Sequence, residues 1–165
     1  MSDAAGTLVG KLQQRIDRIA AAAKSARGQP RVFGMEWLDP PFTAGHWVPE
    51  MIRLAGGHDE LTVAGAPSSQ VAWSRIANYD PEIVVLMPCG FTLERTVEEF
   101  AHVDFPVEWR RLSAVREGRV YAVNGSAYFN RPGPRIVEGL KILAEIIQPE
   151  VFPRTSPPEA WRRLG

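Results

Sequence analysis

Four neighbouring residues near the end of the chain carry side chains that could bind a ligand: Tyr128, Phe129, Asn130 and Arg131. They follow the short β-type run 120–123 and the turn signal Asn124-Gly125, and the Pro-Gly-Pro segment 132–134 delays the next helix until about Arg135. In an open α/β sheet, ligands sit beyond the carboxyl ends of the strands, which is where this loop falls. Two aromatic rings, an amide and a guanidinium suggest ligand binding before they suggest catalysis.

Four more aromatic residues could line a ligand site: Trp37, Phe42, Trp47 and Trp73. Phe42 ends the Asp-Pro-Pro-Phe segment 39–42, and this segment and the loops 64–69 and 88–91 each follow a strand or open a helix. Each ring could instead belong to the core, because buried aromatics outnumber ligand-stacking ones in ordinary domains. Arg131 could likewise donate to a backbone carbonyl and stabilise its turn. The residues alone leave both interpretations open.

The sequence gives little support to metal, disulfide or catalytic chemistry. The histidines are scattered, without an HExxH or i,i+4 arrangement: His46, His58 and His102. Cys89 is the one cysteine, so the chain can form no internal disulfide or multi-cysteine site. Acidic residues such as Asp39 and Asp59 are not accompanied by a nucleophile elbow or a serine–histidine pair. We expect no catalytic residues, no metal ligands and no enzymatic activity.

Composition and charge narrow the class of protein. With 165 residues, 45% hydrophobic and 23% charged, the chain has the makeup of one globular domain with a single core. Its 19 basic and 19 acidic side chains cancel. Binding to a phosphate backbone normally requires an excess of positive charge, so nucleic acid is not an expected partner.

Hydrophobic periodicity predicts the elements that position these residues. An amphipathic helix is predicted from Thr7 to Ala26, because Leu8, Leu12, Ile16 and Ile19 recur at three- and four-residue steps. Strands are predicted at 31–37, 83–87 and 119–123, and further helices at 48–55, 93–101 and 135–147. Apolar strands that alternate with helices indicate an α/β fold with a mostly parallel sheet covered on both faces.

Three regions follow from this pattern. We expect a long amphipathic connector helix in residues 1–30, an α/β ligand-binding lobe in residues 31–148, and a Pro-rich carboxy-terminal tail in residues 149–165. The tail contains four prolines, which predict an extended segment, or strap, with one final turn.

Several segments together resemble a known family: EWLDPPFTAGHWVPEMIRLAGG (36–57), VAW (71–73), DPEIVVLMPCGF (80–91), LSAVREGRVYAV (112–123) and YFNRPGPR (128–135). From about Leu8 to Glu150, the chain resembles the carboxy-terminal lobe of the cobalamin-binding, helical-backbone (class III) family of ABC-importer solute-binding proteins. That family has two Rossmann-like α/β lobes joined by one long helix, and the solute lies between the lobes. The resemblance implies that helix 7–26 is the connector and that the amino-terminal lobe is absent from this sequence.

The resemblance also implies roles for individual residues. Phe42 matches the family's corrin-contacting phenylalanine, Trp73 its cleft tryptophan, and Tyr128 and Phe129 its aromatic pair before an arginine, Arg131. Aromatic faces can cover a corrin ring, and an arginine can donate to its amide carbonyls.

Two departures from the family bear on ligand choice and on transport. Asn130 stands where the best-known cobalamin binder has an acidic residue, so specificity could differ. Ser74 stands where family members carry a glutamate that docks on the membrane permease, and Glu50 is a nearby substitute.

The resemblance implies a non-enzymatic module that binds cobalamin or a related corrinoid, with no covalently bound cofactor. A second lobe in trans or a homodimer would supply the other wall, and an ABC permease is a possible partner. An iron-siderophore ligand is an alternative within the class, and a protein-interaction or regulatory domain is the alternative outside it. The sequence shows no secretion signal, so we expect a cytoplasmic product as encoded, and an extracytoplasmic one if the true start lies upstream.

Overall fold

The centre of the sheet is the apolar strand β3 (Ile83–Leu86), in which every residue is buried. β1 (Val32–Trp37) and β4 (Val120–Val123) flank β3 and pair with it in parallel. In the computed structural model, which describes residues 3–165, β2 (Phe42–Thr43) and β5 (Trp161–Arg163) add antiparallel edges, giving the order β2-β1-β3-β4-β5. A strand covered on both faces must be apolar throughout, which explains the continuous run in β3.

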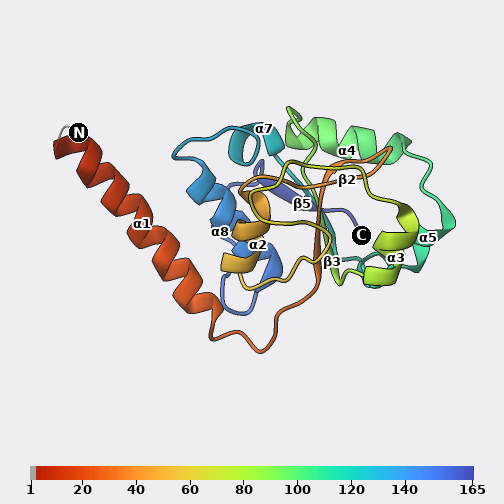
Figure 1. The fold of residues 1–165 in the computed structure, drawn as a ribbon, viewed down its shortest axis with the longest axis horizontal. Helices are drawn as coiled ribbons and strands as arrows, with labels where there is room; N and C mark the ends of the chain where they lie inside the picture. The colour runs from red at the N-terminus through yellow and green to blue at the C-terminus, as the bar shows by residue number, and fades with distance from the viewer. Residues whose placement is uncertain (1–2) are drawn as a thin grey trace.

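Alternate residues of the parallel strands enter two separate cores. Val32, Ile83 and Val85 pack into the first core, and Phe33 and Val84 into the second. The first core is covered by α2 (Val48–Leu54) and α8 (Ile136–Ile147), and the second by α3 (Trp73–Tyr79), α5 (Val107–Arg111) and α6 (Ser113–Arg116). α4 (Leu93–His102) and α7 (Gly125–Tyr128) follow β3 and β4 and lie toward the top of Figure 1.

The first helix, α1 (Asp3–Ala23), projects from the body of the molecule, as Figure 1 shows. Its second half packs on the first core through Ile16 and Ile19, and Arg15 forms an ion pair with Glu138 of α8 at 2.6 Å. Its first half stays open to solvent, where Leu8 is 49% and Val9 56% exposed. Within residues 3–165, no helix is both long enough and apolar enough to cross a membrane.

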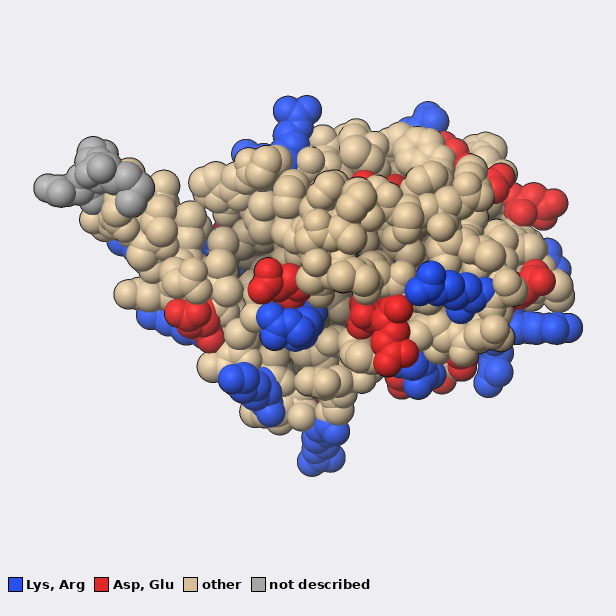
Figure 2. Space-filling view, viewed as in Figure 1, with Lys and Arg blue, Asp and Glu red and all other residues tan. Residues whose placement is uncertain are grey.

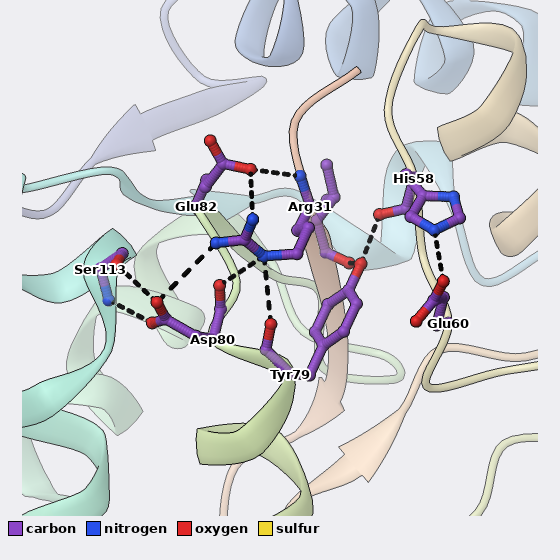
Figure 3. Close-up of polar contacts among 8 residues, drawn as sticks. Arg31, His58, Glu60, Tyr79, Asp80, Glu82 and Ser113 are labelled. Carbon is purple, nitrogen blue, oxygen red and sulfur yellow. Dashed lines mark hydrogen bonds and ion pairs between the residues drawn. The ribbon is translucent and has the colours of Figure 1, made fainter. Parts of the chain in front are cut away.

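A polar cluster joins the amino-terminal ends of β1 and β3 (Figure 3). Arg31 donates through Nε to the carbonyls of Tyr79 and Asp80, and its guanidinium lies 3.3 Å from Glu82. Asp80 accepts from the backbone and the hydroxyl of Ser113, both at 2.8 Å. Partial burial opposes ionisation of Asp80, but these bonds and the Arg31 charge outweigh it and hold the Asp80 pKa below its usual value. The cluster therefore holds the strands together at their amino-terminal ends, opposite the carboxyl ends where the ligand loops lie.

The predicted α/β class with a mostly parallel sheet is confirmed, and each predicted strand and helix is present with ends shifted by up to a few residues. Two predictions near the end of the chain were wrong. Asn124-Gly125 is not a simple turn, because the Asn124 side chain accepts from Ala127 N at 3.0 Å and caps α7. The tail 149–165 is not only a strap, because its residues 161–163 pair with β4 as β5.

Candidate functional site

Two adjoining hollows open at the carboxyl ends of β1 and β3. The first, the aromatic hollow, has a volume of about 450 Å³ and is lined by Glu36, Trp37, Pro40, Phe42, Ser68 and Cys89. The second, the inner hollow, measures about 220 Å³ and is lined by Glu36, Gly45, His46, Trp47, Val48, Met87, Cys89, Phe129 and Asn130. Since Glu36 and Cys89 line both, the two hollows form one continuous surface, which we call the groove.

The aromatic hollow is built on the bulged pairing of β1 with β2. Trp37 and Phe42 are direct partners in that antiparallel register, which places their side chains next to each other on one face. Trp37 is 39% exposed and meets the Phe91 ring edge-on, with 5.4 Å between centroids. The guanidinium of Arg95, a residue of α4, lies 5.2 Å from the Phe91 centroid. The Trp37 ring is therefore supported by a neighbouring ring and still open to a ligand.

Hydrogen bonds between three loops hold the inner hollow in shape. Trp47 Nε1 donates to the Phe129 carbonyl at 2.9 Å, and Gly90 N donates to Asn130 Oδ1 at 3.0 Å. Gly125 sits beneath this contact, where an added Cβ would lie 2.7 Å from the Pro88 carbonyl oxygen. These contacts tie the loops that follow β2, β3 and β4 to one another.

The groove is aromatic and poor in charge. Among the described residues that line it, Glu36 is the only one with a carboxylate, and none is a lysine or arginine. Figure 2 shows a largely uncharged surface over α7 and β2, whereas acidic and basic side chains mix lower on the same face. Within residues 3–165, no group of three or more His, Cys, Asp and Glu side chains could hold a metal ion.

The structure brings together five of the predicted ligand residues: Trp37, Phe42, Trp47, Phe129 and Asn130 all line the groove. Phe129 offers the groove little of its ring, because the residue is 1% exposed and packs in the first core. Its backbone carbonyl is what holds Trp47. The ligand role of each of these residues stays a prediction.

The other three predicted ligand residues lie elsewhere. Tyr128 lines a separate hollow of about 230 Å³ with Glu138, Lys141, Ile142, Ser156 and Pro157, because the short helix α7 turns its side chain away from Asn130. Arg131 is exposed and does not line the groove. Trp73 packs 6.0 Å from the rings of both Phe105 and Trp109 against the second core.

The two residues considered for partner docking are both on the surface. Glu50 lies on α2, where its carboxylate pairs with Arg53 at 3.3 Å, and Ser74 is exposed in the first turn of α3. Their docking role also stays a prediction.

Sequence reasoning placed loops 64–69 and 88–91 near the site but missed Glu36 as an individual lining residue. A signal for it exists in the strand alternation. Val32 points into the first core, and Glu36 occupies an even position of the same strand, where an apolar residue would be expected. Glu36 is partly exposed where the buried part of β1 ends, and a carboxylate there is available to a ligand.

Comparisons with known proteins agree with this architecture. The family model described as periplasmic binding protein matches residues 2–127. An uncharacterized ABC transporter substrate-binding lipoprotein of Bacillus subtilis strain 168, YvrC, is 34% identical over 87 residues, which are 53% of this chain and 26% of that protein.

Solved structures share the fold at low sequence identity. The TroA-like periplasmic binding protein FepB of Veillonella parvula has a TM-score of 0.72 at 17% identity, with 93% of this chain and 49% of that chain covered. The periplasmic vitamin B12 binding protein BtuF of Vibrio cholerae has a TM-score of 0.63 at 20% identity, with 86% and 52% covered. An ABC-type Fe3+-hydroxamate transport system structure from Saccharomonospora viridis has a TM-score of 0.67 at 20% identity, with 87% and 49% covered.

This chain therefore spans about half the length of those solved proteins and about a quarter of the curated relative. The half that it matches has the mixed sheet, the flanking helices and the carboxyl-edge loops of one lobe. Since the family model covers most of its residues, the chain belongs to the periplasmic binding protein family.

Proposed function

We propose that this chain binds cobalamin or a related corrinoid without chemical change, as one lobe of an ABC-importer-type solute-binding protein. The observation that carries the proposal is the pairing of Trp37 with Phe42 at the carboxyl edge of the sheet, beside a hollow of about 450 Å³. Family membership and the fold likeness to a vitamin B12 binding protein support it.

The chemistry of the groove suits such a ligand. A corrin ring is a large, partly apolar disc fringed by amides, so aromatic side chains can cover its face while polar groups meet its rim. Trp37 and Phe42 supply the apolar surface, and Glu36 and Asn130 supply polar atoms in the adjoining inner hollow. A single lobe covers one face of the ligand, so we expect weaker binding than a two-lobe clamp would give.

The charge of the groove favours a corrinoid over an anionic iron-siderophore complex such as a ferric catecholate. Anionic siderophores call for cationic groups, yet the described lining contains no lysine or arginine, and Arg131 lies outside it. Cobalamin side chains carry neutral amides, which are compatible with the one carboxylate present.

Completion of the site requires a second wall. We propose that a separately encoded lobe or a second copy of this chain supplies it, in an extracytoplasmic complex that delivers ligand to an ABC permease. Sedimentation of the chain with and without cyanocobalamin tests this. A shift from monomer to dimer on adding ligand supports the second copy, and an unchanged monomer that still binds ligand supports a separate partner.

Calorimetric titration with cyanocobalamin and with a ferric hydroxamate tests the ligand and the site together. We expect binding of cyanocobalamin and not of the hydroxamate, and we expect Phe42→Ala to weaken it at least tenfold, because one of the two rings that line the aromatic hollow is lost. Tyr128→Ala is the control, since Tyr128 is also a partly buried aromatic but lines a different hollow. Binding that depends on Tyr128 and not on Phe42, or binding of the hydroxamate alone, would contradict the proposal.

A further inference from the structure

Glu36 is held in a fixed position at the junction of the two hollows. It lies near the end of β1, is partly buried, and its Oε2 accepts a hydrogen bond from Gly45 N at 3.2 Å. The Gly45 backbone packs closely against the backbone at Ser68, because an added Cβ at Gly45 would lie 2.2 Å from Ser68 N. The backbone of the loop after β2 therefore presents the carboxylate toward the groove and does not leave it to swing into solvent.

No lysine, arginine or histidine among residues 3–165 forms an ion pair with Glu36. The described residues lining the groove also contain no lysine or arginine. The Gly45 N–H is the one donor to the Glu36 carboxylate recorded among residues 3–165, so the carboxylate can accept further hydrogen bonds. A further donor can come from the ligand.

A complementary donor faces the same hollow. Asn130 Oδ1 is occupied by the N–H of Gly90 at 3.0 Å, which leaves the Asn130 amide N–H groups to donate. The inner hollow thus offers a strong acceptor on Glu36 and a donor on Asn130. A primary amide needs one of each, because its NH₂ group donates and its carbonyl accepts.

We infer that Glu36 is a specificity-determining residue that accepts a hydrogen bond from a primary amide on the ligand and repels a carboxylate at the same place. The inference rests on the proposed function, and it narrows the ligand to corrinoids whose rim is amidated. Replacing that amide with a carboxylate would set two negative charges against each other in a groove without a lysine or arginine to separate them.

The test compares the dissociation constants of cobinamide, which carries rim amides, and cobyrinic acid, in which carboxylates replace them. The wild-type protein should bind cobinamide at least tenfold more tightly, as expected for one charge-assisted hydrogen bond exchanged for a repulsion. Glu36→Gln should remove most of that preference, because the glutamine side chain can donate to a carboxylate as well as accept. Glu50→Gln is the matched control, since Glu50 is exposed on α2 and does not line the groove.

The outcomes separate this inference from the proposed function. If the wild type binds neither corrinoid, the proposed function fails. If it binds both equally, or if Glu36→Gln keeps the full preference for cobinamide, the role of Glu36 is refuted while corrinoid binding stands. The wild-type comparison requires no variant, so equal binding of the two corrinoids refutes the role of Glu36 even if Glu36→Gln does not fold.

Discussion

Replacing Glu145 with glutamine tests how the last strand is held on the lobe. Glu145 lies in α8 with its side chain 1% exposed, yet its carboxylate is fully used. Oε1 accepts from the backbone N–H groups of Thr155 and Ser156 at 2.9 and 3.0 Å and from the Thr155 hydroxyl at 3.0 Å. Oε2 accepts from the Ser156 hydroxyl and from Trp161 Nε1 at 3.2 Å. One carboxylate thus anchors the segment that leads into β5.

The expected loss can be bounded from these contacts. A hydrogen bond to a charged acceptor contributes about 1.5–3 kcal/mol. The free energies of several bonds to one acceptor are coupled, so they are not additive. Glutamine keeps one acceptor oxygen and turns an NH₂ group toward buried donors, so we expect the free energy of unfolding to fall by about 3 kcal/mol at pH 7. Glu98→Gln, at an exposed position of α4, should change it by less than about 0.5 kcal/mol.

The pH dependence gives a second readout of the same anchor. Burial opposes ionisation of Glu145, but the bonds from Ser156, Thr155 and Trp161 outweigh it and hold the Glu145 pKa below the ordinary value of 4.5. A depressed folded-state pKa contributes stability that is present above the ordinary pKa and is lost as the pH falls through the folded-state pKa. The deficit of Glu145→Gln should therefore shrink in acid.

Urea unfolding followed by tryptophan fluorescence measures both effects, and hydrogen exchange at 161–163 reports the strand itself. We expect faster exchange at β5 in Glu145→Gln and not in Glu98→Gln. The role of Glu145 in anchoring β5 would be refuted if Glu145→Gln is as stable as the wild type at pH 7. It would also be refuted if the difference in unfolding free energy is the same at pH 7 and pH 3.

Three further perturbations test other parts of the account. Burial raises the pKa of Asp59 from 3.8 to about 6, and the Asp59 Oδ2 is buried without a partner in residues 3–165. The protonated Asp59 side chain should therefore contribute stability below pH 4, and this contribution should be lost as the pH rises through 6. The free energy of unfolding, measured from pH 4 to pH 8, should therefore decline by about 3 kcal/mol less in Asp59→Asn than in the wild type. Gly125→Ala should lower the free energy of unfolding by about 1–3 kcal/mol and weaken ligand binding, because its Cβ would lie 2.8 Å from Asn130 Oδ1. Gly133→Ala is the control and should have neither effect, because a Cβ at Gly133 meets open space. Asp80 has a φ of 47°, a left-handed conformation that asparagine tolerates, so Asp80→Asn should melt closer to the wild type than Asp80→Ala in calorimetry.

The parts of the fold that the sequence predicts are those with strong internal patterns. The run at 83–86 is apolar at every position, and α8 and α1 have clear helical periodicity. β2 and β5 have no such pattern. Phe42–Thr43 is a two-residue strand produced by the bulged pairing with β1, and Trp161–Arg163 becomes a strand because Glu145 and Tyr121 hold Trp161 against the sheet.

The candidate site was predictable as a set of loops and less so as a set of side chains. The Pro-Pro-Phe segment and the strand-end loops do meet in the groove. Adjacency along the chain grouped Tyr128 with Asn130, but the turn of α7 sends the two into different hollows. Trp73 could not be placed from its motif, since its position depends on packing with Phe105 and Trp109, which lie more than 30 residues further along the chain.

Amide chemical shifts of the labelled protein, recorded during titration with cyanocobalamin, test most directly whether the groove is the ligand site. We predict shifts concentrated in segments 36–48, 87–89 and 129–130, which supply most of the groove lining. The amide chemical shifts of the residues around Trp73 and Trp109 should stay unchanged. Saturating cobalamin that leaves the groove segments unshifted, or that shifts α3 and α5 instead, would contradict the account.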